Sequence, residues 1–287
     1  MPELPEVEIV KQSLEKNVKN KQIKKVVINN YDLRFKLSKD FSSKINFSKI
    51  QYVKRFSKYI LFYLDNKSII VLHLGMSGTI HIIRNWRKNN FTNSSFYSSP
   101  FLPEKHNHVI IFFDNLKIIY NDPRRFGFFK IIKNNKKLEH FFKDYGLEPF
   151  DKNFNLEYLR KSLKNKKKNI KSYLLDQKFI SGIGNIYANE ILYFCKINPF
   201  KQSGRLNNKD YKNIILYSKK VLRSAIKKGG SSIKNFANTQ GKKGGFQDNF
   251  KVYQRDKLKC LRKECTGKIK KKMISNRSVF YCNKCQK

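Results

Sequence analysis

The chain has 287 residues, of which 62 are Lys or Arg and 21 are Asp or Glu, so its formal net charge is +41 at pH 7. Hydrophobic residues make up 40% of the sequence and aromatic residues 14%, which excludes a wholly disordered chain. The charge argues against a small-molecule enzyme without a polyanionic partner. It favours nucleic acid as the partner, with an anionic membrane surface as the weaker alternative.

The sequence shows no sign of a membrane or export segment. Its apolar runs are shorter than the roughly 18 to 20 residues needed to span a bilayer. The acidic start MPELPEVE lacks the basic residues and apolar stretch of a signal peptide. We therefore expect a cytoplasmic protein without a membrane partner, and a monomer.

The first predicted element is a helix that ends near Asn17. Pro5 suits its first turn, and acidic residues there favour the positive end of the helix dipole. One face carries apolar residues at helical spacing: Leu4, Val7, Val10 and Leu14.

Residues 22–132 are predicted to be mostly β structure. Short β-branched and aromatic runs alternate with turn signals, and several runs are apolar on both faces, as in sheets packed on each other. The runs cover residues 23–28, 59–64, 69–74, 109–113 and 126–132. Residues 85–107 are polar and rich in Ser and Asn, which predicts a long exposed loop.

The pattern changes to a helical period after residues 146–149, which we interpret as a domain boundary. Helices are predicted over 155–165, 169–178, 186–195 and 208–228, the last ending at Gly229 and Gly230. The sequence thus predicts an α+β protein with three domains: a β-sandwich (1–147), a helical domain with a flexible loop (148–249) and a cysteine-rich tail (250–287).

Four of the five cysteines lie in the tail with the spacing C-x4-C-x16-C-x2-C. Since disulfides are disfavoured in the cytosol, two close pairs predict one structural Zn²⁺ held by thiolates. The ligands are Cys260, Cys265, Cys282 and Cys285. Two strands between the pairs would form a hairpin with Arg277 near its tip, and the metal would supply most of the tail's folding energy. The fifth cysteine, Cys195, is predicted to be a small buried hydrophobe.

The start Met1-Pro2-Glu3 offers a nucleophile. A small second residue permits removal of Met1, which would leave Pro2 with a free secondary amine. Attack of that amine on a sugar anomeric carbon gives an iminium ion, whose charge promotes elimination of the adjacent phosphate. Glu3 could shuttle the protons.

Seven segments together resemble the bacterial formamidopyrimidine-DNA glycosylases, which repair oxidised guanine. They are MPELPEVE, RFSKYILFYL, HLGMSG, NDPRRFG, SGIGNIYANE, NTQGKKGGFQ and the cysteine hairpin, in this order over essentially the whole chain. The resemblance implies an N-terminal β-sandwich carrying a catalytic helix. It also implies a C-terminal half with a helix–two-turn–helix motif and a zinc finger, and double-stranded DNA with oxidised purines or abasic sites running between the halves.

The resemblance also implies residue roles. Pro2 would attack C1′ of the damaged nucleotide, Glu3 would act as acid and base, and Glu6 would support the site. Lys58 and Arg277 complete the predicted catalytic set by holding phosphates near the lesion.

Other residues are implied to bind the DNA. Met76, Arg124 and Phe126 would fill the space left by an everted base, and Arg124 would hydrogen-bond the orphaned cytosine. Further phosphate ligands would be His73, Lys171 and Asn185. The loop around 231–246 would close over the flipped base. The reaction implied is excision of 8-oxoguanine opposite cytosine and of formamidopyrimidines, followed by β,δ-elimination.

Some features depart from the family pattern. The first cysteine pair is separated by four residues instead of two, which predicts a distorted turn. Asn198 and Asn107 stand where the family often has histidine and aspartate.

Three alternatives remain open. They are an endonuclease VIII-like enzyme acting on oxidised pyrimidines, a zinc-dependent DNA-binding protein without catalysis, and a basic ribosome-associated protein. Leu4 favours the glycosylase over endonuclease VIII, which typically has Gly there.

Overall fold

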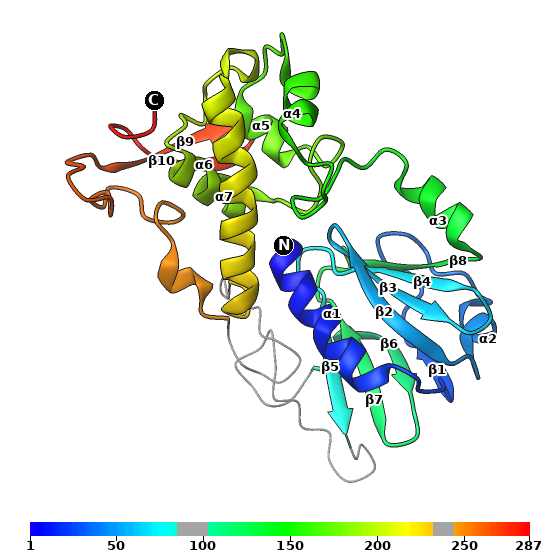
Figure 1. Cartoon of the computed structure of the whole chain (residues 1–287). Coiled ribbons are helices and arrows are strands. Elements are labelled where there is room, and N and C mark those ends of the chain that lie inside the picture. Colours follow the sequence, from blue (N-terminus) through cyan, green and yellow to red (C-terminus); the bar gives the residue numbers. More distant parts are fainter. Residues whose placement is uncertain (85–102, 232–243) are drawn as a thin grey trace. The chain divides into compact units, whose positions relative to one another are not determined.

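The computed structural model describes residues 1–84, 103–231 and 244–287 (Figure 1). The chain forms two compact units. Unit 1 comprises Met1–Lys143 with Lys228–Gly245, and unit 2 comprises Asp144–Lys227 with Phe246–Lys287. Within the described residues, the helices are all too short or too polar to cross a membrane.

Unit 1 begins with helix α1 (Leu4–Val18), as predicted to within a residue at its end. Pro5 occupies the first turn, where a missing N–H costs nothing. Glu6 accepts the backbone N–H of Glu3 at 2.9 Å, which satisfies a donor that no helical carbonyl can reach. The apolar stripe of the helix packs into the core.

Two four-stranded antiparallel sheets follow, which confirms the predicted sandwich class. The first sheet has the order β1-β6-β7-β5 and the second β2-β3-β4-β8. The strands are β1 (Lys25–Ile28), β2 (Ile50–Phe56), β3 (Tyr59–Leu64), β4 (Ile69–His73), β5 (Thr79–Arg84), β6 (Asn107–Phe112), β7 (Leu116–Asn121) and β8 (Phe128–Ile132). One hydrophobic cluster joins residues of α1 with residues of both sheets.

Several elements of unit 1 were not predicted. Strands β2, β5 and β7 mix polar and apolar residues, and two short helices, α2 (Phe41–Ile45) and α3 (Asn135–Phe142), flank the strands. The predicted polar loop ends earlier than expected, because a 3-10 turn, Glu104–His106, leads into β6. The rest of that loop, residues 85–102, lies outside the described residues.

Unit 2 contains the four predicted helices. They are α4 (Leu156–Leu163), α5 (Ile170–Leu175), α6 (Asn185–Cys195) and α7 (Asn208–Lys227). Asn155 and Asn169 cap α4 and α5 by accepting a backbone N–H, as short polar side chains do at helix starts. Gly229 and Gly230 follow α7 with φ of 77° and 79°, in the left-handed region that ends helices.

The tail of unit 2 forms the predicted hairpin from β9 (Ile269–Ile274) and β10 (Arg277–Cys282). Ser275 and Asn276 connect the strands with φ of 46° and 60°, the two positive values of a tight hairpin turn. Arg277 therefore begins β10 directly after the tip, as expected, and is exposed.

The two units divide the chain differently from the three predicted domains. Residues 228–245 belong with the N-terminal sandwich, and the cysteine hairpin belongs with the helices. Hydrogen bonds between Ser231 and Glu6 explain the first difference. Contacts of α6 with β10 explain the second.

Candidate active site

The start of α1 carries two buried carboxylates. Glu3 is 3% exposed and Glu6 is 2% exposed. One Glu6 oxygen, Oε2, accepts the Glu3 backbone N–H, and the other, Oε1, accepts the backbone N–H and hydroxyl of Ser231 at 2.8 and 3.0 Å. Glu6 thus holds both the backbone beside Pro2 and the chain that follows α7.

The amino terminus lies among charged groups of unit 1. Burial lowers the pKa of the Met1 amino group below its usual value, and Lys58 and Arg124 lower it further, whereas Glu3 and Glu6 oppose the shift. These groups can shift that pKa only because they lie near the terminus. The structure therefore brings the predicted nucleophile end together with Glu3, Lys58 and Arg124.

Lys58 lies in the tight turn between β2 and β3. Its side chain is only 6% exposed, and Ser57 before it has φ of 53°. Arg55 donates to the Ser57 carbonyl at 2.9 Å and forms an ion pair with Glu8 of α1 at 2.8 Å. This chain of contacts fixes the turn that carries Lys58 against helix α1.

His73, at the end of β4, is a neutral side chain. Burial lowers the pKa of His73 to about 4, and Lys58 and Arg34 add to this effect. The Gly75 N–H donates to Nδ1 at 3.1 Å, so the ring proton of the neutral form lies on Nε2. In this neutral state His73 can offer a phosphate the N–H of Nε2.

Met76, Arg124 and Phe126 lie on two loops of unit 1. Met76 is 47% exposed and Phe126 is 41% exposed, which is unusual for such large apolar side chains. The Arg124 guanidinium lies over the Phe126 ring, 4.4 Å from its centroid. Exposed apolar side chains of this size are typical of a surface that binds another molecule.

Unit 2 holds the other predicted phosphate ligands, Lys171 and Asn185, together with Arg277. Lys171 is fully buried and donates to the Ser278 carbonyl at 2.8 Å, so in this structure its ammonium group is paired with the cysteine hairpin. Asn185 is partly exposed and donates to the same carbonyl at 3.0 Å. Both side chains hold the start of β10 next to the exposed Arg277.

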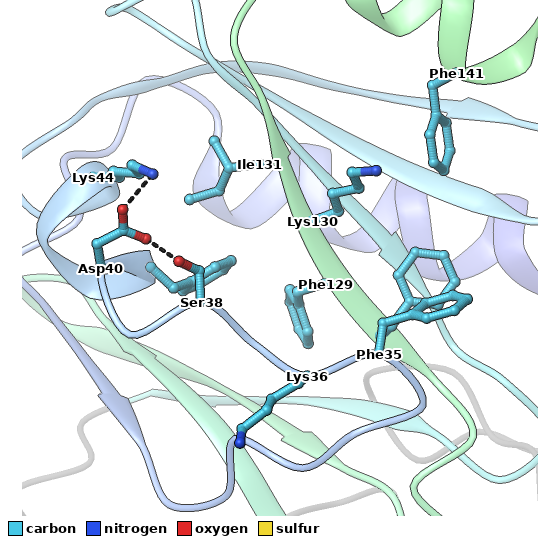
Figure 2. Close-up of a pocket in the computed structure, with 11 residues that line it drawn as sticks. Phe35, Lys36, Ser38, Asp40, Lys44, Phe129, Lys130, Ile131 and Phe141 are labelled. Carbon is cyan, nitrogen blue, oxygen red and sulfur yellow. Dashed lines mark hydrogen bonds and ion pairs between the residues drawn. The ribbon is translucent and has the colours of Figure 1, made fainter.

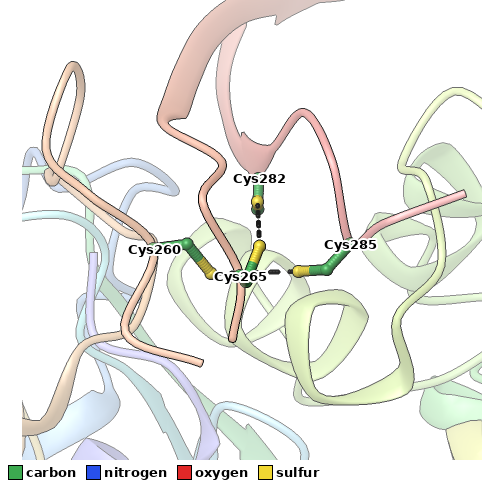
Figure 3. A group of neighbouring side chains, drawn as sticks. All are labelled: Cys260, Cys265, Cys282 and Cys285. Atoms are coloured by element: carbon green, nitrogen blue, oxygen red, sulfur yellow. Dashed lines mark hydrogen bonds between the residues drawn. The ribbon is translucent and has the colours of Figure 1, made fainter. Parts of the chain in front are cut away.

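The four tail cysteines converge on one point (Figure 3). All four sulfur atoms lie within 4.8 Å of one another. Two pairs, Cys260–Cys285 and Cys265–Cys282, are 3.8 and 3.6 Å apart. A tetrahedral ion with metal–sulfur bonds of about 2.3 Å needs sulfurs about 3.8 Å apart, so this geometry fits a metal ion.

The protonation of these thiols also fits a cation. Burial raises the pKa of Cys282 and Cys285, while the Gly267 N–H lowers the pKa of Cys265 to about 7. Without a cation, the buried thiols would stay protonated at neutral pH. A bound metal would convert them to thiolates.

Comparisons with known proteins agree over the whole chain. Residues 1–129 match the formamidopyrimidine-DNA glycosylase N-terminal domain, and residues 145–237 match the H2TH domain of the same enzymes. Formamidopyrimidine-DNA glycosylases from Wolbachia of Brugia malayi and from Rickettsia bellii are 41% and 40% identical, over all of both chains. The chain belongs to the formamidopyrimidine-DNA glycosylase family. It is thus a DNA repair glycosylase.

Solved structures of this family show the same fold. A Lactococcus lactis Fpg mutant in complex with Fapy-dG containing DNA has a TM-score of 0.87 and 29% identity, with all of both chains covered. The same organism's Fpg in complex with abasic-site DNA has a TM-score of 0.86 and 29% identity, with 99% of each chain covered.

Sequence reasoning missed the residues that dock the cysteine hairpin of this glycosylase. Glu190 of α6 is fully buried and accepts three backbone N–H groups, those of residues 251, 252 and 253, at 2.9 to 3.0 Å. Burial raises the pKa of Glu190, and these three donors oppose the shift. Asn189 accepts the Phe280 N–H at 2.9 Å. A polar pair within an apolar helix, Asn189-Glu190, is the signal that could have found them.

The longer first cysteine knuckle has a structural use. Its extra residues include Arg262, which donates to the Tyr193 carbonyl at 2.8 Å and lies over the Tyr193 ring, 4.8 Å from its centroid. The knuckle is therefore fastened to α6, and all four sulfurs still converge.

The other two departures leave local structure intact. Asn107 accepts a hydrogen bond from the Asn121 side chain at 2.9 Å inside the sandwich, so no unpaired charge is buried there. Asn198 accepts the Phe200 N–H at 3.0 Å in a turn. The predicted base-capping loop falls largely on residues 232–243, which lie outside the described residues.

Unit 1 also has a pocket of about 470 Å³ away from these residues (Figure 2). It lies between the segment 35–44 and strand β8, and the predicted site residues do not line it. Lys44 there is paired with Asp40 at 2.5 Å, and Lys130 lies over the Phe141 ring. The pocket is therefore not the candidate active site.

Proposed function

We propose that this glycosylase excises oxidised purines, chiefly 8-oxoguanine opposite cytosine and formamidopyrimidines, and then cuts the strand by β,δ-elimination. The observation that carries the proposal is the position of the amino terminus beside Glu3, Glu6, Lys58 and Arg124. Removal of Met1 would leave the Pro2 nitrogen at the same end of α1. Relatives in complex with Fapy-dG and abasic-site DNA support this choice of substrate.

The first step would be attack of the Pro2 nitrogen on C1′ of the everted nucleotide. The bond between C1′ and the base breaks, and the base leaves with its electron pair and a proton. Burial lowers the pKa of the Met1 amino group at this end of α1. Similar surroundings would lower the pKa of the Pro2 nitrogen once Met1 is removed, which would favour the unprotonated, nucleophilic amine. Loss of the amine proton frees the nitrogen lone pair. That pair then breaks the bond between C1′ and O4′, O4′ takes up a proton as the sugar ring opens, and the iminium ion forms between the Pro2 nitrogen and C1′.

The iminium ion would drive strand cleavage. Its positive charge makes the C2′ proton acidic, and removal of that proton expels the 3′ phosphate. A second elimination expels the 5′ phosphate, and water hydrolyses the sugar from Pro2. Glu3 is the carboxylate next to Pro2, and it would carry protons at the sugar.

DNA binding would use groups from both units. Lys58 and Arg277 would hold phosphates, with neutral N–H donors from His73 and Asn185. Met76, Arg124 and Phe126 would occupy the space left by the everted base.

We also propose that the cysteine cluster holds one structural Zn²⁺, supplied by Cys260, Cys265, Cys282 and Cys285. Sulfur-only ligation is typical of structural zinc. Bound zinc would fix the tail that carries Arg277. We further propose that the enzyme acts in the cytoplasm as a monomer.

Borohydride trapping tests the nucleophile. Protein with a processed N-terminus, verified by mass, should crosslink to DNA that contains 8-oxoguanine opposite cytosine. The same protein with an N-terminal tag, which buries the Pro2 nitrogen in a peptide bond, should give no crosslink. A C-terminal tag is the matched control and should not matter. Absence of a crosslink with processed protein would refute the proposal.

A second substrate class has one observation in its favour. A Lactococcus lactis Fpg structure is a complex with oxidised-pyrimidine DNA. Excision rates on 8-oxoguanine and thymine glycol in the same duplex separate the two classes. Faster excision of thymine glycol would favour the endonuclease VIII-like alternative.

A further inference from the structure

Asp122 is a fully buried carboxylate between the two loops that carry Met76, Arg124 and Phe126. Its Oδ1 accepts the Ser77 hydroxyl and the Arg124 backbone N–H, the latter at 3.2 Å. Its Oδ2 accepts the Tyr120 hydroxyl at 2.8 Å and the Gly127 backbone N–H at 2.9 Å. Both oxygens are therefore fully used as acceptors.

Each of the three loop residues that donate to Asp122 either is, or directly follows, a residue proposed to fill the space left by the everted base. Ser77 follows Met76 in the chain, Gly127 follows Phe126, and Arg124 donates its own N–H. One carboxylate thus holds two separate loops: it accepts two backbone N–H groups on the loop of Arg124 and Phe126, and the Ser77 side chain on the loop of Met76.

The two loops also cross at very short range. Gly75 has φ of 66°, and a Cβ there would overlap the backbone of Phe126 and Gly127. A Cβ at Gly127 would overlap the Tyr120 hydroxyl and the His73 carbonyl. With no room for side chains at the crossing, the position of one loop determines the position of the other.

We propose that Asp122 is a positioning residue for base eversion, which sets Met76, Arg124 and Phe126 in a single arrangement. The inference rests on the proposed function and extends it to a residue that does not touch DNA. Large side chains on loops lose entropy when they order in a DNA duplex, and a prearranged set loses less. Asp122 therefore supports eversion of the damaged base from a duplex and filling of the space that it leaves, but not the chemistry at the sugar.

The geometry makes Asp122→Asn a sharp test. The amide has one acceptor oxygen and one donor nitrogen, and each side of the carboxylate faces one backbone N–H. Whichever way the amide turns, its NH₂ meets a backbone N–H that can only donate. The variant must lose one loop hydrogen bond while keeping the volume of the side chain.

Two substrates separate positioning from chemistry. One is duplex DNA with 8-oxoguanine opposite cytosine, measured as the single-turnover excision rate. The other is a single-stranded abasic oligonucleotide, which has no opposite base and no stack to refill, measured by borohydride trapping. Asp122→Asn should slow duplex excision about tenfold and change single-stranded trapping less than about twofold, as expected for one lost buried hydrogen bond.

Asp65→Asn is the matched control. Asp65 lies in unit 1, is exposed and accepts the Lys49 backbone N–H at 3.0 Å, away from both loops. It should leave both measurements unchanged. Equal losses on both substrates for Asp122→Asn would overturn the inference, and so would no loss on either.

Milder variants cover the case in which Asp122→Asn does not fold. Ser77→Ala and Tyr120→Phe each remove one hydroxyl donor and leave the backbone donors paired. Each should slow duplex excision about two- to fivefold with single-stranded trapping unchanged, and the absence of this split would refute the inference. Wild-type protein that traps neither substrate would refute the proposed function instead.

Discussion

The sandwich of unit 1 and the cysteine hairpin of unit 2 are stabilised by different means. The sandwich has a large apolar cluster drawn from α1 and both sheets. The hairpin cluster has six buried residues, of which two are the metal-site cysteines Cys260 and Cys282. The first region has a large apolar core, whereas the second combines a small apolar cluster with four converging thiols and buried polar contacts with α6. Perturbing those contacts should therefore affect the two regions unequally.

Removal of the metal should have the largest effect. Structural zinc contributes about 10 to 16 kcal/mol in small zinc-binding peptides, far more than the hairpin's own core can. Cys282→Ser or a strong chelator should unfold the hairpin and weaken duplex binding more than about 100-fold. The sandwich should keep its own thermal transition. Zinc content, calorimetry and DNA titration measure these effects.

Cys195→Ala is the control for this experiment. Cys195 is buried on α6 outside the cluster, and burial raises its pKa, as predicted for a small hydrophobe. The variant should retain one zinc per chain. Loss of zinc in Cys195→Ala, or an intact hairpin in Cys282→Ser, would contradict the claim that a metal held by the four tail cysteines stabilises the hairpin.

Glu190→Ala should have the next largest effect. It leaves three buried backbone N–H groups without their acceptor, and it should lower the free energy of unfolding of unit 2 by about 3 kcal/mol. Denaturant unfolding measures this. Glu157→Gln, an exposed change on α4, should cost less than about 0.5 kcal/mol. Similar values for the two variants would mean that α6 does not anchor the hairpin.

Lys171 and Arg277 should separate support of the hairpin from phosphate binding. Lys171→Met removes one of two donors to the Ser278 carbonyl and should cost about 1 to 2 kcal/mol of stability. The slope of log affinity against log salt should not change. Arg277→Ala should keep stability and reduce that slope by about 1. A smaller slope of log affinity against log salt in Lys171→Met would show that Lys171 binds a phosphate.

His73 should give the smallest effect, visible as a pH dependence. Its pKa is about 4 in the folded state, below the ordinary value of 6.5, so the unfolded chain binds the proton more readily. The stability from neutral His73 is complete above pH 6.5 and is lost as pH falls towards 4. His73→Gln should lessen the fall in melting temperature between pH 6.5 and 5. His140→Gln, an exposed change, should leave that fall as it is in the wild type.

The predicted features are those that depend on local spacing. Helix α1 and strand β3 follow from residues a few positions apart, and the cysteine cluster follows from two close pairs of the same residue type. The structure confirms all three. Strand β2 was missed because its sequence IQYVKRF mixes polar and apolar residues without an apolar run. Its place is set by pairing with β3, which a local pattern does not contain.

The site was predicted less completely than the fold. A motif match predicted Lys171 as a phosphate ligand, but it did not reveal that this lysine is buried and donates to the Ser278 carbonyl. Likewise, the role of Asp122 depends on two loops that meet only in the folded protein. Side-chain partners distant in sequence were therefore the part that a single sequence did not reveal.

The contact between Glu6 and Ser231 has a consequence for synthesis of the chain. The two residues are 225 positions apart, so the ribosome must make most of the protein before the acceptor on α1 meets its donors. Until then, the Glu6 carboxylate, which is buried in the folded protein, lacks its hydrogen bonds from Ser231. Nascent chains cut short before residue 231 should therefore hold helix α1 loosely, and proteolysis of such chains should begin at their amino ends.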